Sequence, residues 1–332
     1  MKFLIAGLGS IGRRHFRNLL ALGERDILLY RTHRATLPDD ELAGFPVETD
    51  LHAALAYRPD TIIISNPTAL HLDVAIPAAQ SGCHILLEKP VSNSIERVDE
   101  LEQAVHQNGI KVLVGFQFRF HPGLQQVKKL LDEGAIGEPL SARAHWGEYL
   151  PNWHPWEDYK LGYAARPELG GGVVLTLSHP LDYLRWFLGE VESLWAFTSH
   201  KGLTMPVEDL AEIGLHFKNG AIGSLHLDYD QRPPSHTLEI IGTHGTVRWD
   251  NADGITRLAR VGPDDKAGPW QVFPPPEGFE RNWMFLDEMR HFRDVVHGEA
   301  EPVCTLQDGI QALRLALAAH QEQLVHFAQD PS

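Results

Sequence analysis

The first third of the chain alternates short apolar runs with longer stretches that have helical spacing. Parallel strands are covered by helices on both faces, so they form near-continuous runs of apolar residues. Runs of this kind occupy Phe3–Ala6, Ile27–Tyr30, Thr61–Ser65, His84–Leu87 and Lys111–Phe116. The stretches between them predict helices over Ile11–Leu22, Leu70–Gln80 and Ile95–His106. Residues 1–120 are therefore predicted to form an α/β domain with a doubly wound parallel sheet.

The pattern changes after about Phe120. A further helix is predicted over Pro122–Glu133, and then apolar and polar positions alternate, which is typical of strands with one buried face. Such alternation is found at Leu140–Trp146, Glu192–Thr198, Ala211–Phe217, Ile222–Asp228, Thr237–Ile241 and Thr246–Trp249. Two closing helices are expected over Trp283–Val296 and Asp308–Phe327. Residues 121–332 thus predict an α+β domain with an open, mostly antiparallel sheet, and the last helices are expected to pack back on the first domain.

The composition and charge of the chain limit the kinds of molecule and the compartment that we expect for this protein. The net charge is −15 and no long run of Lys or Arg occurs, which disfavours nucleic acid and anionic membranes as partners. No apolar stretch is long enough to span a bilayer. The two cysteines, Cys83 and Cys304, lie far apart and predict no disulfide framework, so we expect a cytoplasmic protein.

A glycine-rich turn follows the first predicted strand and opens the first predicted helix. Its three glycines fit the G-x-G-x-x-G pattern, in which they allow the tight turn, the close approach of a diphosphate and the packing of helix on strand. The exposed N–H groups at such a helix start favour an anion. We therefore predict a Rossmann domain whose dinucleotide contacts are Gly7, Gly9, Ser10, Ile11 and Gly12. The alternative is a glycine turn that holds no ligand.

The end of the second predicted strand bears on the choice of dinucleotide. NAD-binding domains often place an acidic residue there, on the ribose 2′-hydroxyl. This chain has Arg31, Thr32 and Arg34 instead, which could bind a 2′-phosphate. The expectation is NADP(H), with NAD(H) as the alternative if these residues form a solvated basic loop.

Two strand ends in the first domain carry residues capable of chemistry. Asn66, Pro67, Thr68 and His71 follow one strand, and Glu88-Lys89-Pro90 follows the next. Ligands of open α/β sheets bind beyond these strand ends. A partly desolvated Lys89 could share proton transfer with a substrate hydroxyl. The alternative is a Glu88–Lys89 pair on the surface before a proline turn.

A histidine in the second domain is the other candidate for proton transfer. Three glycines precede an apolar helical run in which His179 and Asp182 are three positions apart and share one helix face. His179 could act as an acid or base near neutral pH, with Asp182 to orient it. The alternative is a buried histidine with a purely structural role.

In order along the chain, these segments resemble the Gfo/Idh/MocA family of glucose–fructose oxidoreductases and inositol dehydrogenases. The matching segments span nearly the whole chain: Gly7-x-Gly9-x-x-Gly12, Asn66-Pro67-Thr68-x-x-His71, Glu88-Lys89-Pro90, Gly115 to Phe120, Gly134-x-Ile136-Gly137 and the glycine segment with His179-x-x-Asp182. The resemblance implies an NAD(P)-dependent oxidoreductase acting on a sugar, an amino sugar or a nucleotide sugar. It also implies a homo-oligomer, a dimer or tetramer formed through the open sheet.

The resemblance also assigns roles to residues. It implies that the segment Asn66–His71 and Glu88 lie along the dinucleotide, that Lys89 contacts the nicotinamide and the reacting hydroxyl, and that His179 is the acid/base. It implies that Gln117 and Arg119 line the pocket. Many members have an acidic residue three or four positions before the histidine, where this chain has Leu175 and Thr176. The proton is then expected to pass between Lys89 and His179 alone.

Aromatic residues of the second domain complete the expected substrate site, because aromatic faces stack on the C–H surfaces of sugars. The candidates are Trp153, His154, Trp156 and Tyr159, together with Arg119 and Asp182. The alternative for this stretch is a packed aromatic loop.

Other classes of function remain open or are disfavoured. A glycosidase that uses transient oxidation by a tightly held NAD, and a non-catalytic dinucleotide sensor, are the alternatives to an oxidoreductase. We expect no metal centre: His216 and His226 fall on neighbouring strands, but no metal-binding motif occurs. No G-x-S-x-G motif of a serine hydrolase is present either.

Overall fold

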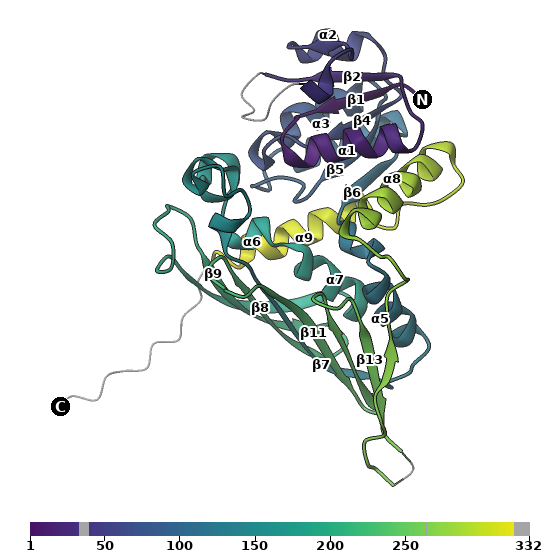
Figure 1. Cartoon of the computed structure of the whole chain (residues 1–332), viewed down its shortest axis with the longest axis vertical. Helices are drawn as coiled ribbons and strands as arrows, with labels where there is room; N and C mark the ends of the chain where they lie inside the picture. Colours follow the sequence, from purple (N-terminus) through teal and green to yellow (C-terminus); the bar gives the residue numbers. More distant parts are fainter. Residues whose placement is uncertain (33–39, 263, 322–332) are drawn as a thin grey trace, which may run out of the picture.

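The computed structural model describes residues 1–32, 40–262 and 264–321. Figure 1 shows two layered domains, with the first sheet at the top and a larger sheet below it. Arg34 and the end of the last predicted helix lie outside the described residues.

The first domain is a six-stranded sheet in which every neighbouring pair is parallel. Its order is β3-β2-β1-β4-β5-β6, so the doubly wound fold expected from the apolar runs is confirmed. The strands are β1 (Phe3–Ala6), β2 (Ile27–Tyr30), β3 (Val47–Glu48), β4 (Thr61–Ile64), β5 (His84–Glu88) and β6 (Val112–Gly115). The helices are α1 (Ser10–Ala21), α2 (Leu51–Ala56), α3 (His71–Gln80) and α4 (Val98–Asn108). The order reverses between β1 and β4, which is where ligands of such sheets bind.

The second domain is an eight-stranded sheet of order β14-β13-β12-β11-β7-β10-β9-β8. The strands are β7 (Pro139–Gly147), β8 (Val191–Ser199), β9 (Leu210–Phe217), β10 (Ile222–Asp228), β11 (Ser235–Gly242), β12 (Gly245–Asp250), β13 (Thr256–Arg260) and β14 (Gln271–Phe273). The pairing of β7 with β10 is parallel and the other pairs are antiparallel, as expected of a mostly antiparallel sheet. The turn at Asn219 and Gly220 joins β9 to β10 as an antiparallel pair.

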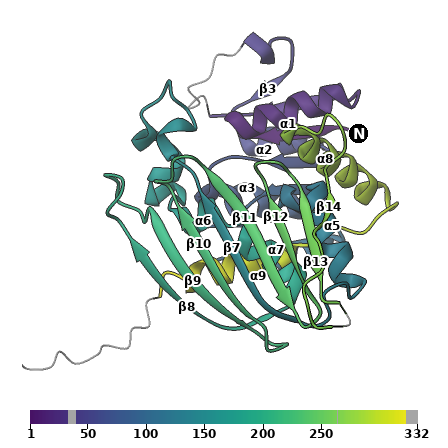
Figure 2. The same cartoon turned by 60° about the horizontal axis from the view of Figure 1, so that its bottom comes forward.

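Helices cover only one face of this larger sheet. Those that contact it are α5 (Pro122–Asp132), α6 (Val173–Thr176) and α7 (His179–Leu188), while α9 (Leu306–Ala318) packs on α6 and α7, and α8 (Arg281–His297) packs on α1 of the first domain. Helices α6, α7 and α9 lie between the two sheets in Figure 1, and Figure 2 looks onto the opposite, uncovered face. None of the helices in the described part of the chain is both long and apolar enough to cross a membrane.

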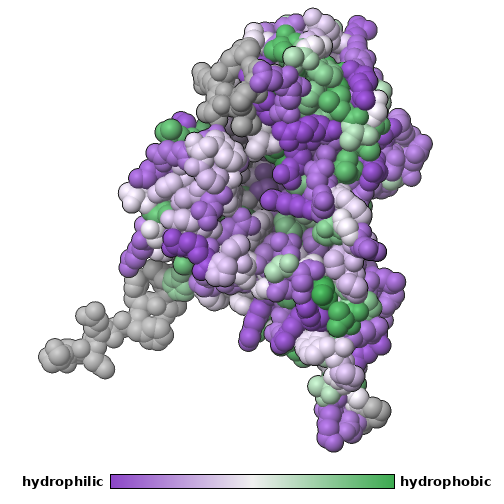
Figure 3. Space-filling view, in the orientation of Figure 1, coloured by the Kyte–Doolittle hydropathy of each residue, from purple (hydrophilic) through white to green (hydrophobic). Residues whose placement is uncertain are grey.

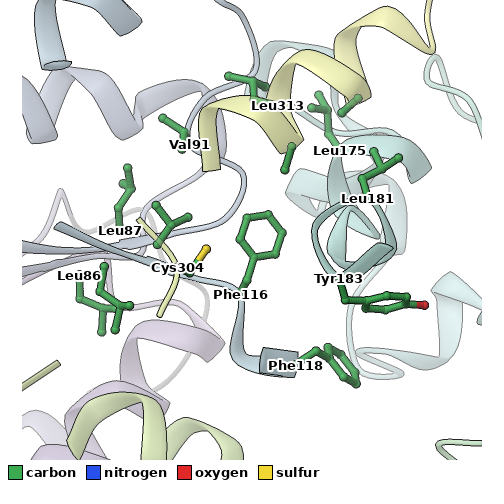
Figure 4. Packing of buried hydrophobic residues seen from close by; sticks show 14 of the residues in the cluster. Leu86, Leu87, Val91, Phe116, Phe118, Leu175, Leu181, Tyr183, Cys304 and Leu313 are labelled. Carbon is green, nitrogen blue, oxygen red and sulfur yellow. The ribbon is translucent and has the colours of Figure 1, made fainter. Parts of the chain in front are cut away.

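The two domains share a continuous apolar core at their junction. Figure 4 shows Phe116 between side chains of the first domain, such as Leu87 and Val91, and side chains of the second, such as Leu175 and Leu181. Helix α9 packs against β6, α6 and α7, while α8 packs against α1. The end of the chain therefore ties the second domain to the first sheet.

Candidate active site

The glycine turn is shaped to hold a diphosphate. Gly7 has φ of 92°, and a Cβ there would lie 2.4 Å from the backbone nitrogen of Asn66, so only glycine fits. Gly9 caps α1 without a capping side chain, and the first turn of α1 holds no acidic residue. The space around Gly9 is open, because an added Cβ would meet nothing within 4 Å. The first-turn N–H groups, including those of Ser10 and Ile11, thus suit a dinucleotide diphosphate.

The end of β2 carries the residues expected to select the dinucleotide. Arg31 is buried, and its backbone N–H donates to the carbonyl oxygen of Glu48 at 3.1 Å. Thr32 is exposed beside it. This pairing fixes the backbone of Arg31 next to the short strand β3.

The loop after β4 is held in place by His71. This residue is buried, with Nδ1 2.9 Å from the carbonyl oxygen of Pro90 and Nε2 3.0 Å from that of Asn66. Burial lowers its pKa, so the ring stays neutral and donates only one of these hydrogen bonds. His71 therefore links the loops after β4 and β5 through its ring, rather than directing the ring toward a ligand. Thr68 is buried in the same loop, under Gly170 of the second domain.

Glu88 ends β5 inside a buried polar cluster. Its Oε1 is 2.7 Å from Nε2 of His15 on α1. Glu288 of α8 is fully buried next to them, and neither of its carboxylate oxygens has a hydrogen-bond partner. Burial, followed by the charge of Glu88, raises the pKa of Glu288 well above its ordinary value. No motif singled out His15 or Glu288, because residues from α1, β5 and α8 meet only in the fold.

Lys89 extends from the end of β5 to the second domain. The peptide between Lys89 and Pro90 is cis. The Nζ atom donates to the backbone carbonyl oxygen of Thr176 at 2.5 Å, at the end of α6. Burial lowers the pKa of Lys89 to about 8, and the charge of Glu88 opposes this only in part. Thr176 is one of the two positions where the family resemblance implied an acidic side chain, and here its backbone oxygen accepts the lysine hydrogen bond.

His179 lies in an aromatic enclosure as the first residue of α7. It is 2% exposed, and its ring centroid lies 4.9 Å from that of Phe118 and 5.6 Å from that of Trp146. Its Nδ1 atom is buried without a hydrogen-bond partner. Burial, and then the charge of Lys89, lower the pKa of His179 well below its ordinary value. The fold therefore brings a neutral imidazole and a half-buried ammonium together from the two domains.

Asp182 does not orient His179. Its carboxylate accepts two hydrogen bonds from Arg119, at 2.9 Å from Nε and 2.6 Å from Nη2. Both side chains are buried, and a further N–H of Arg119 donates to the carbonyl oxygen of Val303. The expectation of a His179–Asp182 pair is thus wrong, because the strongest available partner for a buried carboxylate is the guanidinium. Arg119 and Asp182 join the segment after β6 to α7 beneath the site, instead of facing a substrate.

Most of the expected aromatic wall is packed on its own neighbours. Trp153 meets the ring of Tyr229 edge-on at 5.7 Å, and the ring of His154 lies 5.2 Å from that of Trp156. Tyr159 is partly buried against the core, whereas Trp156 is largely exposed. This segment consists of short 3-10 turns between β7 and α6. It borders the space between the domains, which is hollowed in Figure 3.

Residues from the segment after β6, from β7 and from β11 also lie buried around His179. Gln117, expected in the pocket, is buried directly after β6. The sequence reasoning missed Trp146 and His236, whose rings stack 4.3 Å apart beside His179, and the hydroxyl of Tyr183 lies 3.2 Å from Nε2 of His236. Alternation along β7 and β11 marks the inward positions, but not which of them meet His179.

Comparison with known proteins agrees with this architecture. The model of an oxidoreductase family with an NAD-binding Rossmann fold matches residues 1–116, and the model of the Gfo/Idh/MocA C-terminal domain matches residues 124–248. Myo-inositol 2-dehydrogenase of Thermotoga maritima is 26% identical over 96% of this chain and 95% of its own length. Levoglucosan dehydrogenase of Pseudarthrobacter phenanthrenivorans is 30% identical over 70% of this chain and 67% of its own.

A solved structure supports the same assignment for the fold. Levoglucosan dehydrogenase in complex with NADH superposes with a TM-score of 0.86 at 22% identity, covering 97% of this chain and 96% of that one. The matches to both family models extend over the dinucleotide-binding domain and most of the second domain. The chain therefore belongs to the Gfo/Idh/MocA family and is an NAD(P)-dependent oxidoreductase.

Proposed function

We propose that the site between the two domains oxidises a hydroxyl-bearing carbon of a sugar, amino sugar or nucleotide sugar, or catalyses the reverse reduction. The observation that supports this proposal most is the hydrogen bond from Nζ of Lys89 to the backbone carbonyl oxygen of Thr176, three residues before His179. The relatives named levoglucosan dehydrogenase and myo-inositol 2-dehydrogenase act on polyhydroxylated substrates of this class.

The proposed roles follow from the protonation states. A neutral His179 can take the proton of a substrate hydroxyl as the carbonyl forms, and the Lys89 ammonium can donate a hydrogen bond to the same oxygen. The glycine turn and the loops after β4 and β5 would hold the dinucleotide, whose nicotinamide exchanges a hydride with the reacting carbon. In the reductive direction, the proton returns to the oxygen from the same pair of residues.

The experiment that tests these roles is steady-state turnover of the Lys89→Ala and His179→Ala variants. A panel of sugars and nucleotide sugars, followed by nicotinamide absorbance, first identifies a substrate. Each variant is then expected to turn over at least about a hundredfold more slowly, the usual scale for acid–base groups. Full activity of His179→Ala would refute its assignment. Cofactor binding without hydride transfer to any substrate would favour a sensor, and cleavage of a glycoside without net redox change would favour the glycosidase.

Arg31 and Thr32 support a preference for NADP(H) over NAD(H). No acidic side chain directly follows β2, and a guanidinium suits a 2′-phosphate. The test is titration of NADPH and NADH against the wild type and Arg31→Ala. Weaker binding of NADPH alone is the expected result, and an unchanged NADPH affinity overturns the preference.

Self-association through the uncovered sheet face stays a prediction. That face carries exposed aromatic residues, among them Trp195 and Phe197 on β8. Light scattering of the purified protein distinguishes a dimer or tetramer from a monomer.

A further inference from the structure

A row of polar side chains crosses the uncovered face of the second sheet. His145 on β7 pairs with His226 on the neighbouring strand β10, and His226 pairs in turn with Glu212 on β9. Asp228 follows His226 by two residues and therefore lies on the same face. These four side chains come from three adjacent strands, and a cavity of about 600 Å³ opens beside His145, His226 and Glu212.

Three of them present ligand atoms close to one point. One ring nitrogen of each histidine and one oxygen of Asp228 all lie within 4.8 Å of one another. The two imidazole rings are stacked 4.5 Å apart at an angle of 12°. Nε2 of His226 is hydrogen-bonded to Oδ2 of Asp228 at 2.9 Å, and these atoms would separate to about 3.4 Å as two ligands of a tetrahedral ion with bonds of about 2.1 Å.

The remaining ring nitrogens are held by oxygen atoms. Nδ1 of His226 lies 2.6 Å from Oε1 of Glu212, and Nε2 of His145 lies 2.5 Å from Oε1 of Gln231. Metal-binding histidines in proteins commonly donate their second N–H to a carboxylate or amide oxygen in this way, which fixes the ring and its tautomer. The hydrogen bond to Gln231 leaves Nδ1 of His145 with a lone pair.

The carboxylate is also fixed before any ion binds. Oδ1 of Asp228 accepts backbone N–H groups of Asp230 at 2.8 Å and of Gln231 at 2.6 Å, which leaves Oδ2 for His226. Gly147 lies beneath this carboxylate, and a Cβ there would be 2.1 Å from Oδ2 of Asp228 and from Oε1 of Gln231. The absence of a side chain at Gly147 is what lets Asp228 and Gln231 cover this part of the strand.

We propose that His145, His226 and Asp228 bind one divalent transition-metal ion of the zinc type, with Glu212 and Gln231 orienting the two imidazoles. Two nitrogen ligands and one carboxylate suit Zn²⁺, whereas Mg²⁺ and Ca²⁺ prefer sets made only of oxygen. Water completes the coordination. A bound ion would balance Glu212 and Asp228 in a chain whose net charge is already −15.

The site is independent of the proposed hydride chemistry. Side chains alternate along β7, so His145 faces outward while Trp146 faces inward and packs against His179 at 5.6 Å. The ion would cross-link β7 and β10 behind the aromatic enclosure without reaching a substrate. It is therefore a structural site, not a catalytic one.

The experiment is a Zn²⁺ titration of the full-length, tag-free chain after treatment with a chelator. Calorimetry is expected to show one saturable site per chain, and Co²⁺ in place of Zn²⁺ is expected to give visible absorption bands of a four-coordinate ion. His226→Gln and His145→Gln should each weaken Zn²⁺ binding by at least about tenfold, and Glu212→Gln by about tenfold or more. Mg²⁺ should not compete.

The matched control is His216→Gln. Nδ1 of His216 lies 2.9 Å from Glu192 on the same sheet, but no second histidine is part of this pair among the described residues. Its substitution should leave the Zn²⁺ affinity unchanged. The proposal is overturned if the wild type shows no saturable binding, or if the three variants His145→Gln, His226→Gln and Glu212→Gln all bind Zn²⁺ as the wild type does. Circular dichroism identifies any variant that fails to fold. If His226→Gln fails to fold, His145→Gln, at a half-buried side chain, still tests the site.

Discussion

At the scale of single residues, burial changes the protonation of the groups next to the site. Lys89 and His179 both have lowered pKa values, because a charged form is costly in a desolvated site. The pKa of Glu288 is raised for the same reason, because burial disfavours its charged carboxylate. Burial in this region therefore favours the neutral forms of His179 and Glu288, and it makes Lys89 titrate much closer to neutral pH than usual.

The lowered pKa of Lys89 predicts a pH limit on reduction of the carbonyl substrate. Reduction uses the ammonium as a hydrogen-bond donor, so kcat/KM should fall as the pH rises through about 8, where Lys89 loses its proton. A pH profile of kcat/KM measures this limb. The side chain in Lys89→Arg stays charged at high pH, so the residual kcat/KM of this variant should not fall near pH 8. A wild-type profile that stays flat up to pH 10 would contradict the assignment.

The buried carboxyl of Glu288 predicts a stability that depends on pH. Its folded pKa is raised, so the folded state keeps a proton that the unfolded chain releases above about 4.5, and stability is lost as the pH rises toward the folded pKa. Glu288→Gln removes this loss, so the free energy of unfolding should rise relative to the wild type by more at pH 8 than at pH 5. Urea unfolding at both pH values measures it. The exposed Glu299→Gln, just past the same helix, is the control and should show no such trend.

At the scale of elements, buried ion pairs fix the helix that carries His179. Arg119 follows β6 and Asp182 lies on the first turn of α7, so their double hydrogen bond joins a strand end of the first domain to the helix that begins with His179. Asp308 at the start of α9 approaches the same guanidinium at 3.6 Å. These contacts set the position of His179 relative to Lys89.

Removing one member of this pair should be far worse than removing both. Asp182→Asn removes the negative charge beside the buried guanidinium of Arg119. The free energy of unfolding should therefore fall by about 3–5 kcal/mol. The double variant Arg119→Met/Asp182→Leu should recover most of this loss, because well-packed apolar side chains can replace a buried pair. Urea denaturation of Arg119→Met, Asp182→Leu and the double variant forms the cycle. Purely additive losses would show that the pair is not coupled.

The sequence predicts elements well where their periodicity is long, and poorly where it is short. The apolar runs and alternating segments located β1, β2, β4 to β12 and the major helices. The two-residue β3, the three-residue β14 and the six-residue α2 were not predicted, because so few positions show no period. The five-residue β13 was also not predicted. The break between α6 and α7 at Leu177 and Ser178 was hidden within one apolar run.

The residues of the candidate site likewise differ in how far the sequence predicts them. Motifs that are contiguous in sequence, such as Glu88-Lys89-Pro90, predict which residues lie at the ends of the strands. Partners contributed by distant elements were not predictable: Arg119 for Asp182, His15 for Glu88, and His145 for His226. Each depends on strand register or helix packing, which no local pattern specifies.

At the scale of the whole molecule, the two domains share one core and should unfold together. Helix α9 contacts β6 of the first sheet as well as α6 and α7, and α8 lies along α1. A dinucleotide bound only to the first domain should therefore stabilise both. At a free concentration of a hundred times its Kd, the gain is about 2.7 kcal/mol.

Scanning calorimetry with and without NADPH tests this coupling. A single transition is expected in both cases, and it should move to higher temperature with the cofactor. Two transitions, of which only one responds to NADPH, would show that the domains unfold independently. Gly12→Val is the control: a Cβ at Gly12 would lie 2.0 Å from the carbonyl oxygen of Gly7, so the variant should lose the response.

The parallel pairing of β7 with β10 has a consequence for how such a protein can diverge. Residues 148–221 connect these two neighbouring strands, and they form the aromatic turns, α6 and α7 before they re-enter the sheet as β9 and its edge strand β8. Residues 148–190 lie outside the sheet, so this part can change in length or sequence while the strands keep their register. If the aromatic turns line the substrate site as proposed, substrate preference can then change within this one stretch of chain, while the dinucleotide domain and the sheet stay as they are.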